Sequence, residues 1–113
     1  QEQAAATLAD LAYGDPDMQD AIIEAGGVQP LITILRIGSA LSQEHAARAI
    51  WHLCASTDNQ GTLVNAGIVA ELVNLSRTGS AQAQELSAAV ISDLAKGAVL
   101  ERQIRMDKMV FFN

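Results

Sequence analysis

The stretch AGGVQPL at residues 25–31 returns as AGIVAEL at residues 66–72, 41 positions further along the chain. The same offset aligns residues 25–54 with residues 66–95, and 13 of the 30 paired residues are identical. A backward offset of 42 aligns residues 4–11 with residues 46–53. The chain therefore contains an internal repeat, and a period of about 40–47 residues is typical of helical solenoids.

The spacing of apolar residues predicts three helices in each copy of the repeat. The first is short: Asp15 can cap it, Pro16 suits its first turn, and the counterpart helix begins near Asn59. Gly26 and Gly67 end these helices, as glycine does in the left-handed conformation. We expect the second helices at about 28–37 and 69–77, and the third helices at about 42–55 and 81–96.

Because every predicted element is a helix, the predicted fold is all-α. One such repeat cannot bury its apolar face alone, so we expect the repeats to stack into a solenoid. The third helix carries a stripe for burial at helical spacing. Its members are Ala46, Ala49, Ile50 and Leu53, with Leu8 and Leu11 in the first copy. We expect the last helix of a partial repeat at 1–14, repeats at 15–56 and 57–97, and a degenerate repeat or cap at 98–113.

Composition and charge exclude several classes of function. The net charge is −6, and no Lys or Arg precedes Arg36, so the chain lacks the basic surface that nucleic acids need. No apolar run reaches the ~20 residues of a membrane span. Cys54 is the one cysteine, so no internal disulfide forms, which suits a reducing compartment. We expect Cys54 to lie in the core.

These motifs resemble the armadillo repeat family over about residues 2–97. The first helix ends in Ala25-Gly26, the second carries Leu31 and Leu35, and the third places Glu44 ahead of its Ala-rich stripe. The resemblance implies that the fold is a right-handed α–α superhelix. It also implies that the protein is located in the cytoplasm or nucleus. It also implies a non-enzymatic scaffold that binds proteins and holds no cofactor.

The resemblance further implies that the third helices line a concave groove for an extended peptide. The positions that would face this groove are Gln3, Ala6, Asp10, His45, Arg48, His52, Leu86, Ala89 and Asp93. The family's signature is a Trp followed four residues later by an Asn. Here the Trp place holds Ala6, Arg48 and Ala89, and the Asn place holds Asp10, His52 and Asp93. This departure disfavours an importin-alpha-like receptor and leaves a β-catenin-like mode of binding.

Trp51 completes the candidate site, because tryptophan is enriched where interfaces concentrate their binding energy. Trp51 either protrudes beside the groove or packs between repeats. His45 and His52 share a helix face but lie two turns apart, ~10 Å along the axis, so one metal ion cannot bind both directly. No catalytic residue, metal site or cofactor is predicted.

The leading hypothesis for function is a scaffold that binds a protein or peptide. Acidic residues in the groove favour a basic peptide as the partner. The alternatives are the substrate-recognition module of a larger protein, such as a U-box ubiquitin ligase, and a receptor for basic peptides. Exposed end repeats predict self-association. Met106, Met109, Phe111 and Phe112 predict a helix that covers the end of the stack, with a partner-binding motif as the alternative.

Overall fold

The computed structural model describes residues 2–112, and the side chains of residues 2–98 and of Met106. All the regular structure in the described residues is α-helical, which confirms the predicted all-α fold. The helices are α1 (Glu2–Ala12), α2 (Pro16–Glu24), α3 (Val28–Ile37), α4 (Ala40–Leu53), α5 (Thr57–Asn65), α6 (Ile68–Thr78) and α7 (Ala81–Phe112). None of these helices is long and apolar enough to cross a membrane, as far as the described residues show.

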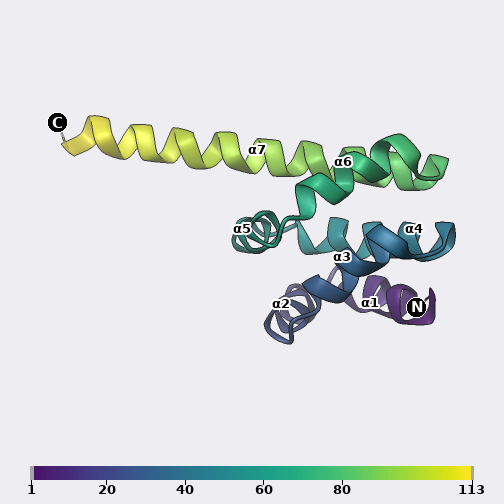
Figure 1. Cartoon of the computed structure of the whole chain (residues 1–113). Helices are drawn as coiled ribbons and strands as arrows, with labels where there is room; N and C mark the ends of the chain where they lie inside the picture. Colours follow the sequence, from purple (N-terminus) through teal and green to yellow (C-terminus); the bar gives the residue numbers. More distant parts are fainter. Residues whose placement is uncertain (1, 113) are drawn as a thin grey trace.

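Helices in equivalent places of the repeat lie side by side (Figure 1). α1 packs on α4, and α4 packs on α7, so these three helices form one layer. α3 and α6 form a second layer, in which α3 packs on α4 and α6 packs on α7. The short helices α2 and α5 run across the direction of the first layer. The arrangement is the stack of repeats that the 41-residue period predicts.

Local chemistry starts and ends the first helices where the sequence predicts. The Asp15 carboxylate accepts a hydrogen bond from the Met18 backbone N–H at 3.1 Å, so it caps α2. Ser56 does the same for α5. Gly26 and Gly67 have φ angles of 80° and 89°, in the left-handed region that favours glycine. These glycines let the chain reverse from the first helix of each repeat into the second.

The buried stripe of the third helix is confirmed in α4 and differs in α1. Ala46, Ile50 and Leu53 are completely buried, and Ala49 is 1% exposed. In α1 the expected burial of Leu11 is wrong, because this side chain is 43% exposed. Among the described elements α1 packs mainly on α4 and α2, so it buries the face that meets them. That face consists of Ala5, Ala9 and Ala12.

The largest departure from the sequence prediction is α7, which continues to Phe112 instead of ending near Lys96. The preceding repeats break at Asp15 and Ser56, whose side chains cap the next helix. Gly97 stands in the equivalent position and offers no capping side chain, and no proline follows it. The surrounding alanines and charged residues favour helix, so the helix passes through this point. Met106 is described and exposed, whereas the side chains of Met109, Phe111 and Phe112 lie outside the described residues.

Candidate functional site

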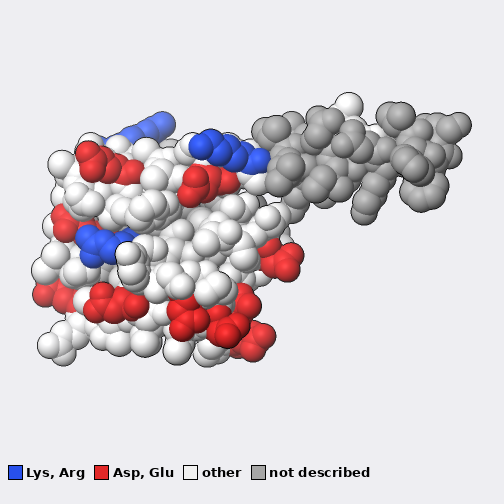
Figure 2. All heavy atoms as spheres, turned by 180° about the vertical axis from the view of Figure 1, so that it is seen from behind, with Lys and Arg blue, Asp and Glu red and all other residues white. Residues whose placement is uncertain are grey.

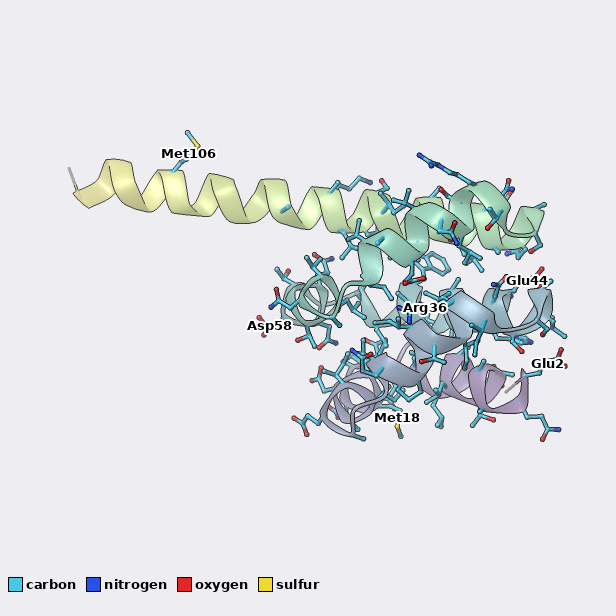
Figure 3. The ribbon with its side chains drawn as sticks, viewed as in Figure 1. Glu2, Met18, Arg36, Glu44, Asp58 and Met106 are labelled. Atoms are coloured by element: carbon cyan, nitrogen blue, oxygen red, sulfur yellow. The ribbon has the colours of Figure 1, made fainter. Side chains whose placement is uncertain are left out.

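The candidate site lies on the layer of α1, α4 and α7, whose helices run parallel and in register. At one end the Ser39 hydroxyl donates to the Glu2 carboxylate at 2.9 Å, and the Ser80 hydroxyl donates to the Glu44 carboxylate at 2.6 Å. Figure 3 shows Glu2 and Glu44 one above the other, at the amino-terminal ends of α1 and α4. Each bond joins one repeat to the next, and the equivalent residues bond both times. The three helices therefore present equivalent positions next to one another.

We call the nine predicted positions of this layer the inner face. Eight of them reach the surface, of which Gln3 and Asp10 are exposed and the others partly exposed: Gln3, Ala6, Asp10, His45, Arg48, His52, Ala89 and Asp93. The prediction is wrong for Leu86, which is 7% exposed and belongs to the hydrophobic core. A leucine at that position packs inward because its apolar surface is more stable there than in water. Figure 2 shows the molecule from behind, where acidic side chains outnumber basic ones.

Arg48 lies at the centre of the inner face and bonds to a residue of its own helix. Its Nη1 donates to Nδ1 of His45 at 3.1 Å, one turn earlier in α4. Arginine can only donate, so Nδ1 of His45 accepts and carries no proton in this arrangement. Arg48 is partly exposed, and the equivalent residues on the neighbouring helices are Ala6 and Ala89, which have small side chains.

Three aromatic side chains meet at the carboxyl ends of α1 and α4. The ring of His52 stacks on Trp51, with centroids 5.5 Å apart, and meets the edge of Tyr13 at 5.3 Å. Trp51 is 42% exposed and Tyr13 is 74% exposed, so both rings offer apolar surface to a partner. The sequence reasoning missed Tyr13. Its position three residues after Asp10, about one helical turn, is the signal that could have found it.

Burial shifts the pKa of two side chains at this end of α4. Desolvation lowers the pKa of His52, and the nearby charge of Arg48 lowers it further, so the imidazole is neutral near pH 7. Desolvation raises the pKa of the Cys54 thiol to about 12, with a smaller contribution from the charge of Asp93. Cys54 is 2% exposed, which confirms its predicted place in the core. A buried, protonated thiol of this kind is unreactive.

The rest of the described surface shows no constellation suited to metal chemistry. No group of three or more His, Cys, Asp or Glu side chains lies close enough to hold a metal ion, within the residues whose side chains are described. A shallow hollow of about 310 Å³ lies where α4, α5 and α7 meet, and Cys54, Gln60, Asp93 and Gly97 contribute to its lining. It borders the inner face at Asp93.

The comparison with known families agrees with the repeat seen in the structure. Residues 15–55 match the family model described as Armadillo/beta-catenin-like repeat. This segment comprises α2, α3 and α4, so one helical repeat of the chain is similar to an armadillo repeat. α5, α6 and the first half of α7 repeat its architecture at the 41-residue offset. Armadillo repeats are generally units of non-enzymatic scaffolds that bind proteins. The search of curated proteins found no match to the chain.

Proposed function

We propose that the inner face binds an extended segment of a partner protein. The observation that carries the proposal is the accessible Arg48 between two alanines, with the exposed rings of Tyr13 and Trp51 beside it. Exposed aromatic and arginine side chains supply much of the binding energy of protein interfaces. An extended segment suits the site because its side chains can meet one helix of the layer after another.

Substitution of the inner face tests this proposal. The triple variant Arg48→Ala, Trp51→Ala, His52→Ala removes the central cation and two of the three rings without touching a fully buried side chain. A matched control, Gln29→Ala, Thr33→Ala, Arg77→Ala, changes three exposed residues of α3 and α6. Partners captured by the immobilised chain should be lost with the first variant and kept with the second. Equal capture by both variants would remove the inner face from consideration.

Self-association is a second proposal, and it concerns the two ends of the stack. Ala88 and Ala95 of α7 are exposed, although their counterparts Ala47 and Cys54 in α4 are buried under the next repeat. At the other end, Leu11 is exposed in the same way. Apolar faces of this kind associate to leave water. Sedimentation velocity should show oligomers that grow with concentration, and a strictly monomeric chain at high concentration contradicts the proposal.

A further inference from the structure

We infer that the partner segment carries one acidic side chain between two basic ones, each about three residues away from it. The acidic side chain binds Arg48, and the basic side chains bind Asp10 and Asp93. This inference rests on the proposed function, since it assigns the chemistry of the segment that the inner face binds. It also narrows the expected partner from a basic peptide to one of mixed charge.

Arg48 is a cation whose charge is not used within the described structure. The one salt bridge among the described residues joins Arg36 to Glu71 on the other layer, at 2.8 Å. Arg48 bonds only to the neutral nitrogen of His45, which engages one of the five N–H donors of the guanidinium. The remaining donors can bind a carboxylate in the two-pronged geometry that arginine favours. A lysine of the partner at this point would be repelled.

Asp10 and Asp93 place negative charge on either side of this cation. Asp10 is exposed on α1, and Asp93 is partly exposed on α7, at the position equivalent to His52 on α4. Asp93 lies near the end of α4, because it lines the same hollow as Cys54. His52 between them is mostly uncharged near pH 7, so it does not offset either carboxylate. Along the stack, the charges of the inner face are therefore negative at Asp10, positive at Arg48 and negative at Asp93.

The spacing of the helices sets the spacing of the partner residues. Packed helices lie about 8–10 Å apart, and a chain in the polyproline II conformation advances about 3.1 Å per residue and presents every third side chain on the same face. One helix step therefore takes about three residues, which gives the pattern Lys-x-x-Glu-x-x-Lys. Arg48 lies one turn, about 6 Å, before the row of Asp10 and Asp93. Its guanidinium bonds to His45, on the side away from that row, and its charge still lowers the pKa of His52.

The exposed rings suit the methylene chains of the flanking lysines. Tyr13 lies one turn after Asp10, and its ring contacts His52 of the next helix. A lysine that pairs with Asp10 would pass its stem across this ring and place its ammonium near the ring face, an arrangement that stabilises a cation. Charge pairing and apolar contact thus favour the same partner residue at this position.

The test uses three labelled peptides of equal length that differ only in the charges at the fixed positions. The first carries Lys-Glu-Lys at intervals of three, the second Lys-Lys-Lys and the third Lys-Ser-Lys, all with the same neutral spacers. Fluorescence anisotropy at low salt measures their binding to the full chain. We expect the Lys-Glu-Lys peptide to bind about fivefold or more tightly than the others, because its carboxylate pairs with the Arg48 guanidinium. The variant Arg48→Glu should reverse this order, so that Lys-Lys-Lys binds best.

The possible failures are distinguishable. If Lys-Lys-Lys binds the unmodified chain as tightly as Lys-Glu-Lys, the inference is wrong while binding to the inner face stands. If no peptide binds, or if the Arg48→Ala, Trp51→Ala, His52→Ala variant binds all three as the unmodified chain does, the proposed function fails as well. The variant Arg77→Glu, changed on the exposed surface of α6, controls for the change in net charge and should keep the original order. Circular dichroism confirms that each variant is folded.

Discussion

Gln19 of α2 donates a hydrogen bond from its side-chain Nε2 to the backbone carbonyl oxygen of Ala12, the last residue of α1, at 2.7 Å. Gln60 of α5 makes the same bond to the carbonyl of Cys54 at 2.8 Å. The carbonyl groups at the end of a helix have no partner within it. The repeated glutamine supplies that partner and ties the end of each third helix to the first helix of the next repeat.

Replacement of Gln19 should therefore destabilise the fold. Gln19→Ala leaves the Ala12 carbonyl without its donor in a buried position, which costs about 1–3 kcal/mol in the free energy of unfolding. Urea denaturation followed by circular dichroism measures the change. Gln29→Ala, on the exposed surface of α3, is the control and should change stability by less than about 0.5 kcal/mol. Equal effects of the two substitutions would show that the bond does not stabilise the joint.

Ser87 offers a substitution that should stabilise the protein. Its hydroxyl is buried in α7 and has no hydrogen-bond partner, whereas the equivalent residue of α4 is Ala46. Ser87→Ala removes this unpaired polar group and should raise the free energy of unfolding by about 1 kcal/mol. Ser92→Ala, exposed on the same helix, measures the separate effect of helix propensity. A gain no larger than that of Ser92→Ala would mean that the buried hydroxyl is satisfied.

The thiol of Cys54 should react very slowly while the protein is folded. Its pKa of about 12 leaves almost no thiolate at pH 8, whereas an exposed cysteine with a pKa near 8.5 is partly ionised there. The rate of reaction with a disulfide reagent should be on the order of 1000-fold lower than in urea, from the thiolate fraction alone. Absorbance of the released thiol follows the reaction. Comparable rates with and without urea would contradict the assigned burial.

His52 should make stability depend on pH below neutrality. Burial and the charge of Arg48 lower its pKa in the folded state below the ~6.5 of the unfolded chain. Well above pH 6.5 the imidazole is neutral in both the folded and the unfolded state, so His52 causes no loss of stability there. As the pH falls below that value, the unfolded chain binds a proton first, so stability is lost until the folded pKa is passed.

Comparison with a variant isolates this contribution. His52→Gln has no titrating group at this position, so its stability should fall less between pH 7.5 and pH 5.5 than that of the unmodified chain. Urea denaturation at several pH values measures both proteins, and the other titrating groups are common to them. Parallel losses in the two proteins would show that His52 does not contribute.

The sequence alone determined the elements whose signals are local. The 41-residue repeat predicts every helix through α6 to within a few residues, because caps such as Asp15 and left-handed glycines such as Gly26 act within one turn of the chain. The composition of the inner face could also be read from the positions of Arg48 and its counterparts. The internal repeat strengthens these signals, because the capping residues and the glycines recur at equivalent positions in both copies.

Only the tertiary structure decided which faces are covered and which side chains meet. The cluster of Tyr13, Trp51 and His52 joins two helices that are far apart in sequence, and no local pattern encodes its contacts. The exposure of Leu11 and the burial of Leu86 depend on which helix packs beside each residue. Caps and turns are fixed by neighbours along the chain, whereas burial and charge pairing are fixed by neighbours in space.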